Sequence, residues 1–166
     1  MSASDRWQTV HPSQFAHEQE ALEVLRGGLP NQSPFRAWSN FEFIADDGSI
    51  NEVDALVVST DRLYLIEIKS WRGEDGGNQT YWTVHTPAGE RTYENPLLLA
   101  NRKAKKLKSL LARQDAFKKA PVPFIQAAVF LSSKECAIQL DEIAGQYVYA
   151  RPGWPAGIRP DLGSQR

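Results

Sequence analysis

The chain of 166 residues is long enough for one domain with a sizeable core, and its 42% hydrophobic and 23% charged residues are typical of globular proteins. A formal net charge of −1 provides no overall field that would attract nucleic acid, so any basic surface must be local. The single cysteine, Cys136, excludes an internal disulfide and a zinc site made only of cysteines, and it fits a reducing compartment.

The N-terminal part of the chain predicts a polar segment followed by a helix. The stretch MSASDRWQTVHPSQF lacks the apolar core of a signal peptide, and no apolar run in the chain is long enough to span a bilayer. We therefore expect a cytoplasmic protein without a membrane partner. The first helix is predicted from Ser13 to about Gly27, where a second glycine follows as a stop signal. Its expected buried side consists of Phe15, Ala21, Leu22 and Leu25.

The middle of the chain predicts a run of strands. An aromatic stretch at residues 35–45 leads into a turn at 46–49, and apolar stretches at 51–59 and 62–70 predict two further strands. Residues 71–79 are rich in glycine and are expected to form a loop. A short strand at 80–86 then ends in a turn at 87–89.

The longest predicted helix covers residues 96–119 and is opened by Asn95-Pro96. A buried strand is expected at 121–133 and a last one at 146–150. Helix, several strands, helix and strand make a mixed α/β pattern, with helices packed on one central sheet. The apolar stripe of the long helix consists of Ala100, Ala104, Leu107 and Leu111.

The C-terminal stretch from Arg151 to Arg166 has no periodicity and is dense in proline and glycine. This composition is typical of a linker. We therefore expect a folded domain at residues 1–150 and a tail at 151–166 that leads to a further domain.

Charged residues occupy positions in the predicted sheet where apolar ones are expected. Glu67 and Lys69 lie on one face of their strand, because side chains alternate along a strand, while Ile66 and Ile68 point to the other face. If this strand pairs with the preceding one as a hairpin, Asp54 lies beside Glu67 near one end of the sheet. By alternation, Val53, Ala55 and Val57 line the face opposite to Asp54.

A divalent cation would compensate these charges, since each buried and unpaired ion costs several kcal/mol. Asp54, Glu67 and the backbone carbonyl of Ile68 are the expected ligands, because Mg²⁺ prefers hard oxygen donors from one or two carboxylates. Mn²⁺ is the alternative ion. Lys69 would then face a phosphate oxygen or the attacking water. A plain ion pair at a sheet edge is the competing interpretation. Two features favour the metal. Glu67-Ile68-Lys69 ends an almost wholly apolar strand, and Asp54 lies near the end of the strand before it.

These residues match a known pattern. Asp54 followed by Glu67-Ile68-Lys69 resembles the D–(D/E)-x-K motif of the restriction-endonuclease-like nucleases. The wider stretch NEVDALVVSTDRLYLIEIKSWRG resembles the nuclease-related domain family, NERD. HEQEALEVL is similar to the opening helix of that family and ENPLLLANRKAKKL to its Asn-Pro helix, so the resemblance extends from Glu18 to about Leu110.

The resemblance implies a restriction-endonuclease-like core and a metal-dependent nuclease that hydrolyses phosphodiester bonds, with DNA as the expected substrate. By position, the first-helix glutamate of the family corresponds to Glu18, its metal-binding aspartate to Asp54, its second carboxylate to Glu67 and its catalytic lysine to Lys69. The sequence departs from the family twice. His17 stands where a glycine usually precedes the glutamate. Leu99 stands where a glutamine commonly follows the Asn-Pro by three residues.

The resemblance also implies a context. NERD domains are often fused to kinases or helicases, and one such case is the N-terminal domain of the large serine/threonine kinase of bacteriophage-exclusion (BREX) systems. A linker-like tail fits a fusion of this kind, and the implied setting is phage defence.

Phosphate contacts require basic groups, and the long helix is rich in them. Arg102, Lys103 and Lys106 are the candidates, because the two lysines border the apolar stripe and are expected to overlook the end of the sheet. A solvated helix face is the alternative interpretation of these charges. Trp71 and Arg72 directly follow the motif and are candidates for contacts with nucleic acid, the tryptophan by stacking on bases.

Two rival interpretations stay open. Leu99 motivates a catalytically silent module of the same fold that binds nucleic acid or a partner protein. The tail motivates a regulatory or dimerisation domain for a fused enzyme, with a homodimer as one outcome.

Overall fold

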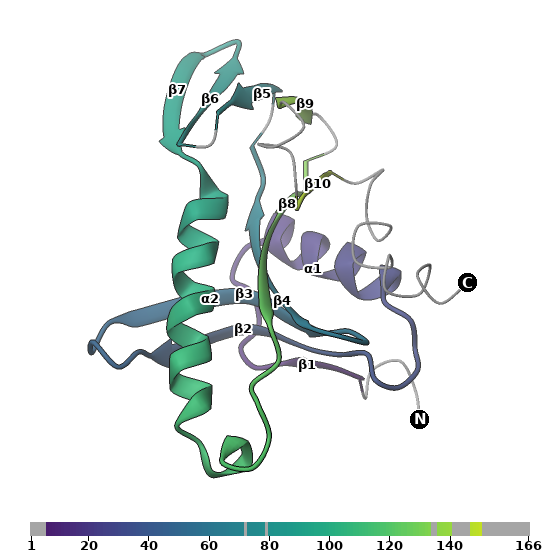
Figure 1. Ribbon diagram of the computed structural model, residues 1–166. Helices are drawn as coiled ribbons and strands as arrows, with labels where there is room; N and C mark the ends of the chain where they lie inside the picture. Colours follow the sequence, from purple (N-terminus) through teal and green to yellow (C-terminus); the bar gives the residue numbers. More distant parts are fainter. Residues whose placement is uncertain (1–5, 72, 79, 134–135, 141–146, 151–166) are drawn as a thin grey trace.

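The computed structural model describes residues 6–71, 73–78, 80–133, 136–140 and 147–150 (Figure 1). Arg72 and the tail at 151–166 lie outside the described residues. The main sheet has six strands in the order β1-β2-β3-β4-β8-β10, and a second sheet has four in the order β7-β6-β5-β9. Within the described part of the chain, no helix is long and apolar enough to cross a membrane.

The strands of the main sheet are β1 (Trp7–Thr9), β2 (Arg36–Ile44), β3 (Ile50–Val58), β4 (Leu63–Lys69), β8 (Ile125–Leu131) and β10 (Val148–Ala150). Those of the second sheet are β5 (Gly73–Gly77), β6 (Tyr81–Thr86), β7 (Gly89–Glu94) and β9 (Cys136–Leu140). The helices are α1 (Ala16–Gly28) and α2 (Pro96–Ala112), with a short 3-10 turn at Asp115–Phe117.

The two helices cover opposite faces of the main sheet. Leu22 and Leu25 of α1 belong to a buried cluster with Tyr64 and Ile66 of β4. Leu107 of α2 belongs to a second buried cluster, which includes Leu63, Leu65 and Ile125 from the sheet. Even-numbered and odd-numbered residues of β4 therefore face different helices, as strand geometry requires. The expected fold class, a mixed α/β protein with a central sheet flanked by helices, is confirmed and is consistent with a restriction-endonuclease-like core.

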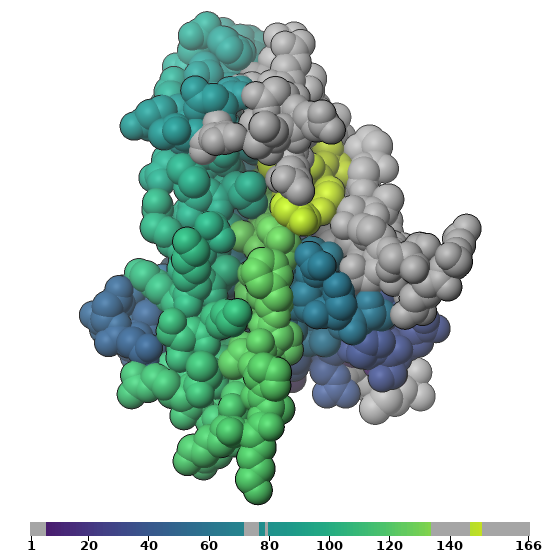
Figure 2. All heavy atoms as spheres, viewed as in Figure 1, coloured from purple at the N-terminus to yellow at the C-terminus, as the bar shows by residue number. Residues whose placement is uncertain are grey.

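The main sheet divides at its centre. β3 and β4 are antiparallel and pair only from Ala55–Ile66 to Val58–Leu63. Beyond that point β3 continues alongside β2, as far as Ile50 opposite Ile44, whereas β4 continues parallel to β8, as far as Lys69 opposite Leu131. Figure 1 shows the two pairs separating, and Figure 2 shows the β2–β3 hairpin protruding beside α2. The separation opens a gap in the hydrogen-bonded ladder next to Asp54 and Glu67.

Several sequence-based boundaries were wrong. The predicted loop at residues 71–79 contains β5, and β1, β7 and β9 were not predicted at all. These short strands form because partners from elsewhere in the chain lie beside them: β1 pairs with β2, and β5 pairs with β6 and β9. The long helix ends at Ala112 and not at residue 119, because Gln114 and Asp115 occupy the positions at which its apolar stripe would continue after Leu111.

The start of the first helix also differs from the prediction. The helix begins at Ala16, and Phe15 has extended backbone angles as its N-cap. Phe15 therefore stands outside the helical period and is 55% exposed, although it was predicted to be buried. Ala21, Leu22 and Leu25 are buried as predicted.

The start of α2 was predicted correctly. Asn95 is its N-cap, and its side-chain oxygen accepts a hydrogen bond from the N–H of Leu97 at 2.9 Å, with Pro96 in the first turn. The Asn95 N–H also donates to the carbonyl oxygen of Thr80 at 2.8 Å. Asn95 is 3% exposed. Its bond to Thr80 ties the start of the helix to the residue just before β6.

Replacing Asn95 by alanine should lower the free energy of unfolding by about 1–2 kcal/mol, because the substitution removes the cap of a buried helix start. Asn101 is exposed in the middle of the same helix and provides a matched control. Asn101→Ala should be neutral or stabilising by about 0.5 kcal/mol through helix propensity. Urea unfolding followed by circular dichroism measures both changes, and equal effects would argue against the cap.

Candidate active site

Asp54 occupies the point where β3 leaves β4. Its Oδ2 atom accepts a hydrogen bond from the backbone N–H of Ile68 at 2.8 Å. The regular pairing of β3 with β4 ends at Ala55 and Ile66. Beyond that point the Asp54 side chain, and not the backbone of β3, binds the amide of β4. The bond holds Asp54 next to Glu67, the residue before Ile68, which is the neighbourhood expected from the hairpin.

The ladder between β2 and β3 is also interrupted at Asp54. Ser39 pairs with Ala55 and Phe41 with Val53, but no pair forms between them, and Asn40 has a φ of 53°. Asparagine tolerates this left-handed region better than most residues do. Val53 packs with the α2-side cluster, whereas Ala55 belongs to the α1-side cluster. The predicted alternation of Val53 with Ala55 was therefore wrong, because the strand is irregular at this point.

Glu67 is a buried carboxylate with a lysine partner from α2. It follows Leu63 and Leu65 on the face that α2 covers. The ammonium Nζ of Lys103 lies 3.3 Å from Oε2 and 3.4 Å from Oε1 of Glu67. The Lys103 side chain is 12% exposed and the Glu67 side chain is 8% exposed. This is an ion pair inside the protein and not a contact on the surface.

The protonation of Asp54 is strongly affected by these surroundings. Burial, and next the negative charge of Glu67, raise the pKa of Asp54 from 3.8 to about 6. The hydrogen bond from Ile68 and the positive charges of Lys103 and Lys69 act in the opposite direction. The charged form of Asp54 is thus disfavoured beside the negative charge of Glu67.

Lys69 belongs to the same group of charges, but its ammonium is directed elsewhere. The Nζ atom of Lys69 lies 5.8 Å from the ring centre of Trp71. Its charge still lowers the pKa of Asp54. The structure therefore brings Asp54, Glu67 and Lys69 into one region, while the lysine in contact with Glu67 is Lys103.

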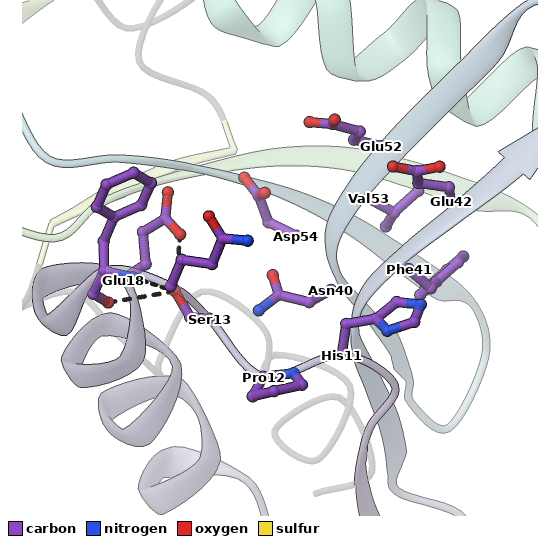
Figure 3. Close-up of a pocket in the computed structure, with 12 residues that line it drawn as sticks. His11, Pro12, Ser13, Glu18, Asn40, Phe41, Glu42, Glu52, Val53 and Asp54 are labelled. Carbon is purple, nitrogen blue, oxygen red and sulfur yellow. Dashed lines mark hydrogen bonds between the residues drawn. The ribbon is translucent and has the colours of Figure 1, made fainter.

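A pocket of about 370 Å³ lies on one side of Asp54. Figure 3 shows Glu18 of α1 and Asp54 of β3 in its wall. Glu18 accepts a hydrogen bond from the Ser13 hydroxyl at 2.7 Å. Glu18 and Asp54 are the predicted catalytic residues that line the pocket. Glu67 and Lys69 are not among the described residues that line it. Asp54 therefore connects the pocket with the buried Glu67–Lys103 pair.

Some residues of this pocket were not recognised from the sequence. His11 follows β1, and its N–H donates to the carbonyl oxygen of Asn40. Asn40 and Glu52 also line the pocket. Glu52 lies two residues before Asp54 on the same strand, and this spacing could have indicated from the sequence that both face the pocket. His11 had no such signal, because β1 itself was not predicted.

The donor chemistry of the site suits a hard divalent cation. Asp54 and Glu67 supply carboxylate oxygens, which Mg²⁺ and Mn²⁺ prefer, and the charge of Glu67 raises the pKa of the neighbouring Asp54. Across the described ranges, no three histidine, cysteine, aspartate or glutamate side chains are grouped as ligands of one ion. Glu18 is thus not part of a three-carboxylate cluster, and its role in a metal shell stays a prediction, as does that of the Ile68 carbonyl.

The candidate nucleic-acid contacts on α2 have carboxylate partners. Arg102 pairs with Glu94 at 2.8 Å, and Lys106 pairs with Asp47 at 3.3 Å. Their positive charges are therefore partly compensated, and their contact with nucleic acid stays a prediction. Trp71 stacks on Tyr93 with ring centres 4.7 Å apart and planes 17° apart, so it packs against the second sheet. Arg72 lies outside the described residues.

The chain is similar to known proteins over most of its length. The nuclease-related domain model matches residues 13–132. A protein named "Probable kinase PglW", from Streptomyces coelicolor, is 48% identical over 112 residues, which cover 67% of this chain and 7% of that protein. The chain thus spans a small fraction of the length of this relative. No solved structure matches.

Asp54 should give the protein a measurable pH dependence of stability. Because the pKa of its carboxyl is higher in the folded chain than 3.8, the folded state retains the proton and is stabilised at low pH. This contribution falls as the pH rises towards 6 and is absent above it. Relative to Asp54→Asn, the wild type should lose about 2 kcal/mol between pH 4.5 and pH 7.

Urea unfolding in EDTA at both pH values measures this difference. Asp115→Asn, at an exposed aspartate, controls for the chemical change itself. Parallel pH profiles of the wild type and Asp54→Asn would show that Asp54 is not perturbed.

Proposed function

The chain belongs to the nuclease-related domain family, and from that premise we propose that it is a metal-dependent nuclease domain that hydrolyses phosphodiester bonds of nucleic acid, with DNA as the expected substrate. The observation that carries the proposal is the meeting of Asp54 and Glu67 where β3 and β4 separate. Burial and the charge of Glu67 raise the pKa of Asp54 there, and Lys69 is close enough to act on the same carboxyl.

Each residue has a role that follows from its position. The carboxylates of Asp54 and Glu67 would hold Mg²⁺ or Mn²⁺, with the Ile68 carbonyl as a further donor. When bound, the ion supplies a Lewis acid for the phosphate and lowers the pKa of a coordinated water. Lys69 would stabilise the negative charge that develops on the phosphate. Glu18, across the pocket from Asp54, would orient the water or complete the shell through one.

The charge of the pocket supports metal dependence. Its wall contains Glu18, Glu42, Glu52 and Asp54. A phosphodiester is itself an anion, so this wall repels the substrate unless a cation neutralises part of the negative charge. Catalysis without a divalent ion is therefore disfavoured by these carboxylates, of which Asp54 is also an expected ligand of the ion.

The larger context belongs to the proposal as well. The relative named as a probable kinase is many times longer than the matched segment, which supports fusion of this domain to further ones. We place the domain next to a kinase in a phage-exclusion (BREX) system, where its nuclease activity or its binding of nucleic acid would be linked to the kinase.

A catalytically silent module is the second candidate. It is favoured by the Glu67–Lys103 pair, in which a protein cation already contacts both oxygens of the second carboxylate. In that case the domain would bind nucleic acid, or dimerise and regulate the fused enzyme, without cleaving phosphodiester bonds.

Purified domain should nick plasmid DNA in Mn²⁺ or Mg²⁺ and lose the activity in EDTA. Glu67→Gln and Lys69→Met should each lower the rate roughly 100-fold or more, as expected for residues that stabilise the transition state. Two exposed residues provide matched controls, Glu90→Gln for the lost carboxylate and Lys105→Met for the lost ammonium. Gel assays on plasmid and single-stranded substrates measure the rates.

The outcomes separate the two candidates. Cleavage that survives both site variants would remove these residues from the mechanism. Binding of DNA by the wild type without cleavage in either ion would favour the silent module.

Binding to DNA through α2 should weaken steeply with salt, because phosphate contacts release counterions. Asp47→Asn leaves Lys106 without its carboxylate partner, so the variant should bind more tightly than the wild type at low salt. Lys106→Met should reduce the salt slope by about one. Fluorescence anisotropy with labelled DNA between about 50 and 200 mM salt tests both. A flat salt profile would exclude α2 as the contacting surface.

A further inference from the structure

The cation on Glu67 is not the lysine of the sequence motif. Lys69 lies two residues from Glu67 on the same strand, yet its ammonium is near the Trp71 ring. Lys103 reaches Glu67 from α2, and its Nζ is almost equidistant from the two carboxylate oxygens, at 3.3 and 3.4 Å. This is the space in front of the carboxylate that any cation bound by both oxygens would need.

The pair is built into the packing of α2 on the sheet. Ala100 and Ala104 flank Lys103 along the helix and are fully buried or nearly so, which permits a close approach of the helix backbone to β4 and β8. The lysine side chain is enclosed as a result and is 12% exposed as a whole. Removing one member of such a pair leaves an uncompensated charge inside the protein, so the contact is energetically coupled to Glu67.

We propose that Lys103 is a resident counter-cation of Glu67 that competes with the divalent ion for this carboxylate and so sets the metal affinity of the site. The inference rests on the proposed function, because it concerns the same two carboxylates. Two cations cannot occupy the same carboxylate oxygens without strong repulsion. Binding of an ion by both oxygens of Glu67 therefore requires the ammonium to withdraw, and the loss of the ion pair subtracts from the affinity.

The position of Lys103 on α2 fits this role. It stands one helical turn after Leu99, the position at which the chain lacks the polar residue expected there. A lysine has a flexible four-carbon stem and three donors, so its ammonium can exchange one anionic partner for another. Lys103 is thus a positioning residue that keeps Glu67 compensated while no metal is bound.

Titration of the whole chain with Mn²⁺ in a calorimeter tests the proposal. Lys103→Met should bind Mn²⁺ about tenfold more tightly than the wild type, because the competitor is gone. Lys105→Met removes one positive charge from an exposed position of the same helix and should change the affinity less than about twofold, since surface charges are well screened. Damage to the structure alone would weaken binding, so a tighter complex distinguishes competition from a structural role.

Thermal unfolding provides a second readout if Lys103→Met folds poorly. Without metal, Lys103→Met should have a lower Tm than the wild type, and Mn²⁺ should raise the Tm of the variant by more than it raises that of the wild type. Lys103→Gln retains a donor without the charge and should show the same gain in affinity with a smaller loss of Tm.

The outcomes keep the two proposals apart. Equal or weaker binding of Mn²⁺ by both Lys103 variants, with binding by the wild type intact, overturns the role of Lys103 and leaves the metal-dependent function standing. Binding by the variants alone supports the competition and argues against a metal-loaded wild type. Absence of binding by all of them overturns both.

Discussion

The hydrogen bond from the Ile68 N–H to the Asp54 carboxylate is the interaction on which the rest of the site depends. It forms where β3 and β4 stop pairing, so the carboxylate satisfies a backbone donor in place of a neighbouring strand. The same bond fixes Asp54 beside Glu67. The gap in the sheet and the pair of carboxylates therefore have one structural cause.

Placing two carboxylates at such a point is unfavourable without compensation. The pKa of Asp54 rises to about 6 because it is buried and because Glu67 is charged. Lys103 and Lys69 provide two positive groups with different partners, one on Glu67 and one near Trp71. The two ammonium groups thus compensate the carboxylates in the absence of a metal ion. Asp54 still lines the pocket.

The helix α2 connects this centre with the edges of the molecule. Arg102 pairs with Glu94 at the end of β7, and Arg113 and Lys106 pair with Asp46 and Asp47 in the turn between β2 and β3. Figures 1 and 2 show the helix lying along β8 on one face. The basic residues of α2 that looked like a surface for nucleic acid also hold α2 to two hairpins. Trp82, packed with Val129 and Leu131, attaches the second sheet to the end of β8 near Lys69.

The amino-acid sequence by itself determined the elements that depend on local chemistry: the Asn-Pro start of α2, the alternation that puts Leu65 and Ile66 on opposite faces, and the spacing of Asp54, Glu67 and Lys69 along two adjacent strands. Only the tertiary structure decided the short strands β1, β5, β7 and β9, because each forms by pairing with residues far along the chain or across a turn. It also decided which lysine contacts Glu67. Lys69 is adjacent in sequence, but the packing of α2 brings the ammonium of Lys103 to the carboxylate from 36 residues away, and no local pattern specifies that distance.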